Sequence, residues 1–210
     1  MNPYNFIRNK TEAVLRRIAQ QQAKRMLSSH QALWQELQHY LEKTKSTGCG
    51  YIDYACLYQA IRTQKPTNVL ECGTGVSTLI IAHALMENER ETGIKGQVTS
   101  MEEHDEWLQM SMSLLPAQYR QYVEFRLSGI VEDKYSLFRG IRYESIPQKE
   151  YDFVFVDGPK YRAPSDGMAT FDFDFIYILS RSDKPVSGLV DKRLSTVFVL
   201  QQLLGPEKVT

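Results

Sequence analysis

Glu71 and the two glycines after it are the residues whose types and spacing first suggest chemistry. They follow a short apolar run, Asn68 to Leu70, and the turn reads Gly73-Thr74-Gly75. Two glycines between a strand and a helix let the backbone turn sharply and approach a bulky ligand, because no Cβ intervenes. The helix expected from Val76 directs its free N–H groups and the positive end of its dipole at the same turn. This pattern is typical of a site for a nucleotide-like cofactor.

Glu71 separates the cofactors that such a turn can hold. A dinucleotide-binding turn reads Gly-x-Gly-x-x-Gly after an apolar strand, because an anionic pyrophosphate sits on the helix N-terminus. Here a carboxylate stands two residues before the first glycine, and Thr78 takes the third glycine position. A negative charge beside the pocket would repel pyrophosphate and would suit a cationic ligand without phosphate. The stretch therefore disfavours an NAD(P)-linked oxidoreductase.

Two further acids follow strands in the same way. Gln97 to Glu102 reads as a strand that ends in an acid, and Asp157 follows the continuous apolar run Phe153 to Val156, which suits a strand buried on both faces. In doubly wound folds, ligands bind at the carboxyl ends of parallel strands, where an acid accepts hydrogen bonds from ribose hydroxyls. We expect Glu102 to hold a ribose, or Glu103 if the register shifts by one, and we expect the acids to share one rim.

These stretches carry a family resemblance. Glu-x-Gly-x-Gly, from Glu71 to Gly75, resembles motif I of the class I S-adenosylmethionine-dependent methyltransferases, and the strand that ends in Asp157 resembles their motif IV. The resemblance implies an α/β fold with a doubly wound, mainly parallel sheet that binds S-adenosylmethionine at its carboxyl edge. It also implies that Asp157 is catalytic and lies between methyl donor and acceptor. The cofactor-binding residues that it implies are Glu71, Gly73, Thr74, Gly75, Ser77, Glu102, Glu103, Ser128, Gly129 and Asp157.

The loop after Asp157 holds the candidate substrate residues Lys160, Tyr161 and Arg162. Their cations could bind an anionic group such as a sugar acid or a phosphate. A solvated surface loop is the alternative interpretation. The loop also resembles, over some twenty positions, the glucuronoxylan methyltransferase type of sequence.

A metal is not expected, although two acids match a metal-dependent pattern. Metal-dependent O-methyltransferases of this fold hold Mg²⁺ with the acids after strands four and five and an adjacent Asn or Asp. Asp157 and Asp191 match the two acids, but Lys192 stands at the third position and would repel a cation. If Mg²⁺ binds, Asp157 and Asp191 are its candidate ligands. Without a metal, Asp157 is the available base, or it hydrogen-bonds to the cofactor or acceptor.

The sequence predicts that the chain is divided into two regions. Residues 1–47 are polar and helix-prone, with apolar residues at helical intervals from Thr11 to Met26 and again from Ser29. The stretch Thr47-Gly48-Cys49-Gly50 is a clear break. We interpret residues 1–47 as an N-terminal helical extension that caps the main domain, with a homodimer contact or a substrate lid as alternatives. Residues 48–210 are expected to form the cofactor-binding domain.

The main domain is expected to alternate helices and strands. Helices are expected over Tyr51–Arg62, Val76–Asn88, Asp105–Leu115, Met168–Ser180 and Leu194–Leu204, and the later strands over Tyr122–Ser128 and Val186–Asp191. The last residues, Pro206 to Thr210, are expected to begin a sixth strand. A complete sheet of this class has seven strands, so we expect that the closing hairpin is missing or that the sequence is truncated.

Composition limits the partners. The 210 residues include 25 Lys and Arg and 25 Asp and Glu, so zero net charge gives no support for a nucleic-acid or anionic-membrane partner. No apolar run approaches about 18 residues, and the first residues lack the apolar segment of a signal peptide. Cys49, Cys56 and Cys72 lack metal-ligand spacing and are interpreted as free thiols. We expect a soluble, cytoplasmic protein.

The predicted function is methyl transfer from S-adenosylmethionine, most directly O-methylation of a small molecule or sugar. The alternatives are a protein methyltransferase and a non-catalytic protein that uses the fold as a binding scaffold. A nucleic-acid methyltransferase is disfavoured, because no Asn/Asp-Pro-Pro-Tyr motif follows the strand that ends at Val156.

Overall fold

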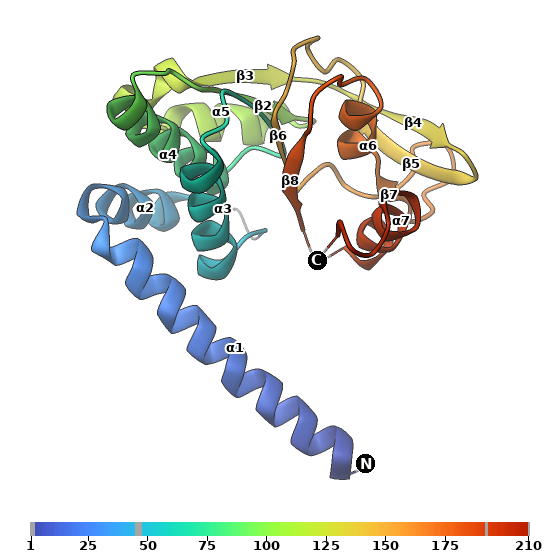
Figure 1. Ribbon diagram of the computed structural model, residues 1–210, viewed down its shortest axis with the longest axis horizontal. Helices are drawn as coiled ribbons and strands as arrows, with labels where there is room; N and C mark the ends of the chain where they lie inside the picture. The colour runs from blue at the N-terminus through green and yellow to red at the C-terminus, as the bar shows by residue number, and fades with distance from the viewer. Residues whose placement is uncertain (1–2, 45–47, 192, 210) are drawn as a thin grey trace.

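The computed structural model describes residues 3–44, 48–191 and 193–209, with the side chains of the first helix described from Glu12 (Figure 1). Five parallel strands form the central sheet in the order β3-β2-β1-β6-β8. Their bounds are β1 Asn68–Cys72, β2 Gln97–Glu102, β3 Val123–Leu127, β6 Phe153–Val156 and β8 Ser187–Val190. Strand order reverses between β1 and β6, which creates the switch point where such sheets bind ligands. The predicted doubly wound α/β fold is confirmed.

The middle of the sheet is buried on both faces, as the apolar strands predict. Val69, Val98 and Phe153 pack into the hydrophobic core beneath α4 (Val76–Thr92). Leu70 and Val154 point to the opposite face and pack into a second core. Each strand therefore contributes alternate side chains to two cores, and this holds the ends of β1, β2 and β6 level with one another.

The N-terminal helices cover the α4 side of the sheet (Figure 1). Helix α1 (Pro3–Ser29) extends away from the body, and near its end Ala23 and Leu27 pack into the core. Helix α2 (Gln31–Lys43) contributes Leu33, Leu37 and Tyr40 to the core that α4 also lines. The predicted helices are confirmed, whereas the domain boundary stays a prediction, and residues 45–47 lie outside the described part of the chain.

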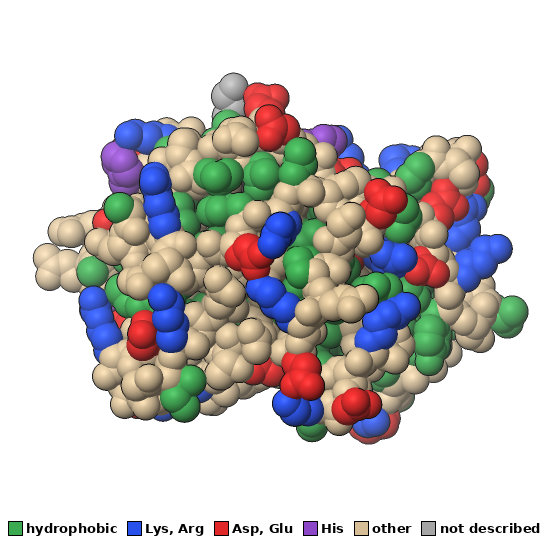
Figure 2. Space-filling view, turned by 90° about the horizontal axis from the view of Figure 1, so that it is seen from above, with side chains coloured by type: hydrophobic (Ala, Val, Ile, Leu, Met, Phe, Trp, Pro, Cys, Tyr) green, Lys and Arg blue, Asp and Glu red, His purple; other side chains and the backbone are tan. Residues whose placement is uncertain are grey.

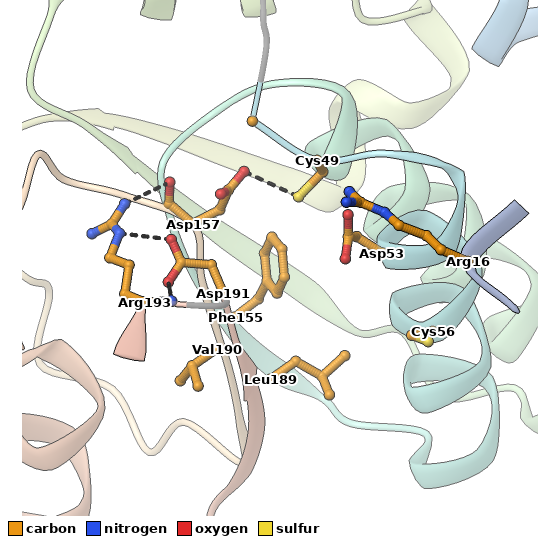
Figure 3. A pocket seen from close by; sticks show the side chains of 11 residues that line it. Arg16, Cys49, Asp53, Cys56, Phe155, Asp157, Leu189, Val190, Asp191 and Arg193 are labelled. Carbon is orange, nitrogen blue, oxygen red and sulfur yellow. Dashed lines mark hydrogen bonds and ion pairs between the residues drawn. The ribbon is translucent and has the colours of Figure 1, made fainter. Parts of the chain in front are cut away.

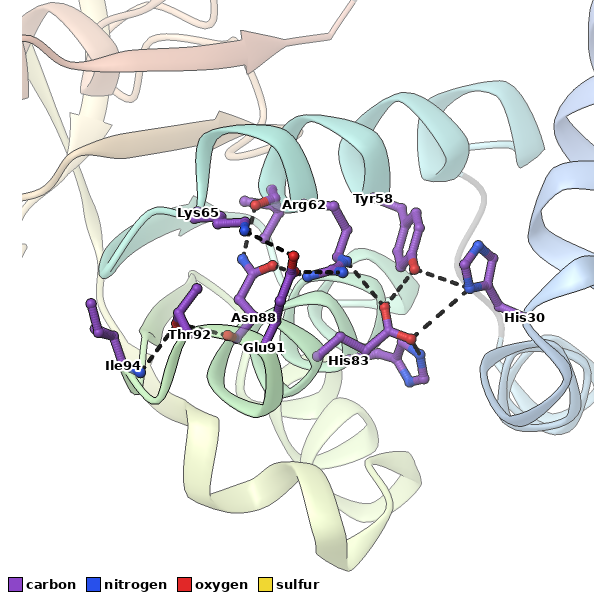
Figure 4. Close-up of polar contacts among 11 residues, drawn as sticks. His30, Tyr58, Arg62, Lys65, His83, Asn88, Glu91, Thr92 and Ile94 are labelled. Carbon is purple, nitrogen blue, oxygen red and sulfur yellow. Dashed lines mark hydrogen bonds and ion pairs between the residues drawn. The ribbon is translucent and has the colours of Figure 1, made fainter.

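A polar network joins α3 (Tyr51–Gln64) to α4 and to the junction of α1 and α2 (Figure 4). Glu87 is its centre: Oε2 accepts a hydrogen bond from Tyr58 at 2.5 Å and lies 3.3 Å from Arg62 Nε. Its Oε1 lies 3.4 Å from His83 Nε2 and 3.9 Å from His30 Nδ1. These contacts hold α3 on α4, and α3 in turn holds the segment before it over the end of β6.

The opposite side of the sheet carries a small second sheet that the sequence did not predict. Strands β4 (Ile130–Tyr135), β5 (Phe138–Tyr143) and β7 (Phe171–Asp172) form it in the order β4-β5-β7. The hairpin of β4 and β5 is antiparallel, and β7 pairs in parallel with β5. The remaining helices are α5 (Asp105–Leu114), α6 (Asp174–Leu179), α7 (Leu194–Leu204) and the 3₁₀ turn η1 (Ala117–Tyr122).

Two expected elements differ in the structure. The helix expected over Met168–Ser180 is wrong in its first half, because β7 pairs with β5 and only α6 is helical. Phe171 and Phe173 pack edge to face with ring centroids 5.8 Å apart. The strand expected from Pro206 is also wrong: residues 206–208 form a turn, closed by a hydrogen bond from Lys208 N–H to the Gly205 carbonyl, and Thr210 lies outside the described residues.

The surface has no strong charge asymmetry on the face in Figure 2, where basic and acidic side chains are interspersed. This matches the equal numbers of acidic and basic residues in the chain. Within the described residues, no helix combines the length and the apolar character needed to cross a membrane.

Candidate functional site

The turn between β1 and α4 is held by the ends of the neighbouring strands. Gly73 has φ +98°, and a Cβ there would lie 3.1–3.2 Å from backbone atoms of Asp157 and Gly158. The fold itself therefore requires glycine at this position, beyond the room for a ligand that the sequence suggested. Thr74 donates hydrogen bonds from its N–H and its Oγ1 to Glu102 Oε2, at 3.3 and 3.1 Å. The turn is thereby tied to both β6 and β2.

Glu71 lies beneath the turn and not on the rim. It pairs in register with Ser100 and Phe155, two residues before the acids that end β2 and β6. The side chain is fully buried, and its Oε2 accepts hydrogen bonds from Thr78 Oγ1 at 2.7 Å and Ser100 Oγ at 2.5 Å. Its Oε1 has no hydrogen-bond partner among the described residues. The three acids share a face of the sheet, but Glu71 is one layer inside, and its role toward a cofactor stays a prediction.

The environment of Glu71 perturbs its ionisation. Burial raises the pKa of Glu71 to about 7, while the hydrogen bonds from Ser100 and Thr78 oppose the rise. The nearby Asp157 carboxylate raises it further. Glu71, whose charge is expected to select between cofactors, is therefore a carboxyl group that ionises near neutral pH.

Glu102 and Glu103, at the end of β2, accept hydrogen bonds from different parts of the chain. Glu102 Oε1 accepts hydrogen bonds from the N–H groups of Glu103 and His104, at 2.9 and 3.0 Å. Glu103 Oε1 instead accepts one from the Lys160 N–H at 3.1 Å. Both acids line a cavity of about 320 Å³, which we call the glycine-turn cavity. Its other lining residues are Gly48, Gly73, Thr74, His104, Trp107, Tyr143, Asp157, Gly158, Pro159, Lys160, Tyr161 and Arg193.

Asp157 also lines a second cavity, of about 550 Å³, which we call the α1-side cavity (Figure 3). Its lining residues are Arg16, Gly48, Cys49, Asp53, Cys56, Phe155, Asp157, Leu189, Val190, Asp191 and Arg193. Gly48, Asp157 and Arg193 line both cavities. The acid at the end of β6 therefore stands between two spaces, one beside the glycine turn and one beneath α1.

Asp157 is held from the α3 side. Its Oδ2 accepts a hydrogen bond from the Cys49 thiol at 3.1 Å. A Cβ on Gly48 would lie 2.6 Å from the same oxygen, so the chain before α3 passes directly over the carboxylate. Burial raises the pKa of Asp157, and the Cys49 hydrogen bond opposes the rise. Burial also raises the pKa of the Cys49 thiol, which keeps it protonated as the donor.

Arg193 organises the end of β8. Its Nε lies 2.7 Å from Asp191 Oδ2, and its other nitrogens donate to the carbonyls of Pro159 at 2.6 Å and Asp157 at 3.3 Å. Asp191 is thereby paired with a cation. Lys192, the residue expected to repel a metal, lies outside the described residues. In the part of the chain that the structure describes, no group of three or more His, Cys, Asp and Glu side chains could hold a metal ion.

The other predicted residues divide into two groups. Those that line the glycine-turn cavity are Gly73, Thr74, Glu102, Glu103, Asp157, Lys160 and Tyr161. Those that line neither cavity are Glu71, Gly75, Ser77, Ser128, Gly129 and Arg162. Ser128 Oγ accepts a hydrogen bond from the Ser145 N–H and donates to the Gly129 carbonyl, both at 3.0 Å, so this turn packs against the end of the hairpin. Arg162 donates to the Gly167 carbonyl within its own loop.

The lining residues that the sequence reasoning missed include Arg16, Trp107, Tyr143 and Arg193. Tyr143 ends the hairpin strand β5, and burial raises its pKa well above the usual value. The apolar residues Ile141 and Tyr143 alternate with polar ones, which is typical of a strand, but no strand was predicted in this stretch. Arg16 and Trp107 carry no local signal, because only the packing of α1 and α5 brings them to a cavity.

One family model and several solved structures are similar to this chain. Residues 70–179, more than half of the chain, match a family model described as a methyltransferase domain. The solved O-methyltransferase from Bacillus cereus in complex with SAH is similar in fold, with 18% identity and a TM-score of 0.51 over 79% of this chain and 70% of that chain. The O-methyltransferase TomG from Streptomyces achromogenes, involved in tomaymycin synthesis and solved with SAM, gives 17% identity and a TM-score of 0.49 over 82% and 68%. No protein with a curated description matches the sequence.

Proposed function

This chain belongs to the methyltransferase-domain family, and from that premise we propose that it methylates a hydroxyl group of a small molecule or sugar, with S-adenosylmethionine as donor. One observation carries the proposal: Asp157 lines both the glycine-turn cavity and the α1-side cavity. In this assignment the glycine-turn cavity takes the cofactor and the α1-side cavity takes the acceptor. Their volumes, about 320 and 550 Å³, fall within the range of about 300–1,000 Å³ that is usual for small-molecule sites.

The residues of the glycine-turn cavity fit a cationic adenosine compound. Glu102 stands beside the switch point, where a strand-end acid accepts ribose hydroxyls. Its Oε1 already accepts two backbone N–H groups, so the longer contacts from Thr74 to Oε2 are those that a ribose would replace. Glu103 and Asp157 add negative charge along the same cavity. S-adenosylmethionine, when bound, supplies an activated methyl group on a cationic sulfur.

The protein's own work is to position the acceptor, exclude water and receive a proton. A hydroxyl acceptor must lose its proton during methyl transfer, and a positioned carboxylate can take it. We assign this role to Asp157, because the raised pKa makes its carboxylate a stronger base. The neighbouring Asp191 is paired with Arg193 and does not line the glycine-turn cavity, so in this assignment it is not placed beside the methyl donor. The thiol of Cys49 holds Asp157 Oδ2, which leaves Oδ1 for the acceptor proton.

Asp157→Asn tests the proposal. Turnover on a panel of hydroxyl acceptors should fall by roughly 10²–10⁴-fold, the usual contribution of general-base catalysis. The affinity for S-adenosylhomocysteine, measured by calorimetry, should stay within a few-fold of wild type. Asp53→Asn is the matched control, because Asp53 lines the α1-side cavity but not the glycine-turn cavity, and an amide oxygen can still accept the Gly50 N–H.

Three outcomes contradict parts of the assignment. Equal losses of turnover and cofactor affinity in Asp157→Asn would make Asp157 a cofactor ligand and not the base. Loss of wild-type turnover on addition of EDTA would show that a metal ion, and not a side-chain base, activates the acceptor hydroxyl. Tight binding of S-adenosylhomocysteine without turnover on any hydroxyl acceptor would favour the protein-methyltransferase or scaffold alternatives.

A further inference from the structure

Arg16 is the cation of the α1-side cavity whose charge the fold leaves free. Within the described part of the chain, its side chain has no hydrogen bond or ion pair and is exposed. Arg193, the other cation of the cavity, is fully engaged with Asp191 and with two backbone carbonyls. Asp53, which lies near Arg16 in Figure 3, accepts a hydrogen bond from the Gly50 N–H at 2.8 Å and thereby caps α3.

Arg16 and the two strand-end acids occupy opposite sides of the cavity. Figure 3 shows Arg16 reaching in from α1 on the side of Cys49 and Asp53, away from Asp191 and Arg193. Asp157 and Asp191 follow the ends of adjacent strands, and because Arg193 pairs with Asp191, Asp157 is the strand-end acid there that carries no ion pair among the described residues. A ligand in this cavity therefore meets carboxylates at the sheet and a guanidinium at α1.

The space continues outward along α1. A third cavity, of about 670 Å³, shares Arg16, Gly48, Cys49 and Asp53 with the α1-side cavity. Helix α1 contributes Ala13, Arg16, Arg17, Gln20 and Gln21 to it. Two guanidinium groups and two amides on one helix face offer donors to an anionic, hydrophilic group. Arg16 stands where the two cavities meet.

The geometry points to an acceptor that carries an anionic group, with its hydroxyl beside Asp157 and its carboxylate or phosphate bound by Arg16. This substrate class rests on the proposed function. A planar guanidinium binds carboxylate and phosphate through paired hydrogen bonds, and the carboxylates at the sheet repel an anion placed in the reverse orientation. This inference assigns anion recognition to the N-terminal helix and not to the loop after Asp157. In that loop, Lys160 and Tyr161 line the glycine-turn cavity, and Arg162 donates a hydrogen bond to the Gly167 carbonyl.

Matched acceptor pairs test the inference. Catechol and 3,4-dihydroxybenzoate share the same hydroxyls and differ by one carboxylate, as do glucose and glucuronate. In wild type, kcat/KM should be higher for the carboxylate member of at least one pair. Arg16→Gln should lower that value roughly tenfold or more, the loss expected for a charge-assisted hydrogen bond, and should leave the neutral member unchanged.

The control is Arg25→Gln, which makes the same change in charge on the same helix at an exposed position that lines none of the three cavities. It should leave both members of each pair unchanged. Equal losses in Arg16→Gln and Arg25→Gln would overturn the inference, because they would reflect the general field of α1. Equal losses on the neutral and the carboxylate members would also overturn it, because they would reflect altered packing. A wild type without preference for a carboxylate member would overturn it as well.

Calorimetry separates this inference from the proposed function. S-adenosylhomocysteine binding to wild type tests the function alone, and Arg16→Gln should leave it unchanged. If wild type shows no turnover, direct titration with 3,4-dihydroxybenzoate and with glucuronate still tests the anion site. Tighter binding than catechol or glucose that is lost in Arg16→Gln and kept in Arg25→Gln supports the site, and any other result overturns it.

Discussion

Glu71→Gln removes a fully buried acid whose pKa burial raises from 4.5 to about 7. Between these values the folded protein keeps a proton that the unfolded chain has lost, so the free energy of unfolding falls as pH rises. Each pKa unit corresponds to about 1.4 kcal/mol, so the cost to stability is about 3 kcal/mol above pH 7. The glutamine variant does not titrate at this position. Its stability relative to wild type should therefore rise by about 3 kcal/mol between pH 4.5 and pH 8.

The comparison across pH isolates the ionisation. The glutamine side chain has the same hydrogen-bonding groups at every pH, so its fixed difference from the protonated carboxyl cancels when the two stabilities are compared across pH. Urea unfolding at pH 5, 6, 7 and 8 without cofactor, followed by circular dichroism, measures the difference. Glu106→Gln, the same substitution at an exposed position, is the control. Wild type and Glu71→Gln curves that stay parallel across this range would refute the reasoning.

Ionised Glu71 should also attract the sulfonium charge of S-adenosylmethionine, which S-adenosylhomocysteine lacks. The ratio of the two affinities should therefore increase as pH rises through 7 in wild type and stay constant in Glu71→Gln. A ratio that does not change with pH in wild type would remove Glu71 from the cofactor site and leave it a structural group beneath the glycine turn.

Two further substitutions test the rim of the site. Glu102→Ala should weaken S-adenosylhomocysteine binding by roughly 1–3 kcal/mol by calorimetry, because a charged acceptor for the ribose is lost, and unchanged affinity would move that role to Glu103. Cys49→Ala removes the hydrogen bond that opposes the rise in the pKa of Asp157, so the acid limb of the pH–rate profile should move to higher pH. Cys49→Ser keeps a donor and should leave the limb in place, whereas identical profiles for wild type and Cys49→Ala would show that the thiol does not influence the base.

The acid-ended strands were predictable because their signals are local. Strand-like stretches that end in an acid, at Glu102 and at Asp157, predict parallel strands whose ends meet at one edge, and the register confirms this. The resemblance to class I S-adenosylmethionine-dependent methyltransferases is likewise confirmed. The depth of Glu71 was not predictable, because it depends on β1 continuing to Cys72 before the turn begins. Because β1 is two residues longer than expected, this acid lies in the interior and not on the rim.

The missed elements depend on contacts between distant parts of the chain. Strand β7 has two residues, and it forms because Phe171 pairs with Gly140 and Asp172 with Ile141. The aromatic residues after Met168 fit a helix equally well when they are considered alone. Arg16 was missed for a similar reason: periodicity predicts the α1 helix, but only tertiary packing sets which cavity the helix crosses.

Parallel calorimetric titrations of wild type with S-adenosylmethionine, S-adenosylhomocysteine and NADH test the central claim most directly. An acidic sheet edge beside the glycine turn should bind both adenosyl compounds in the micromolar range and NADH far more weakly. Tighter binding of NADH than of either adenosyl compound would contradict the account, because these carboxylates are expected to repel a diphosphate from the glycine turn.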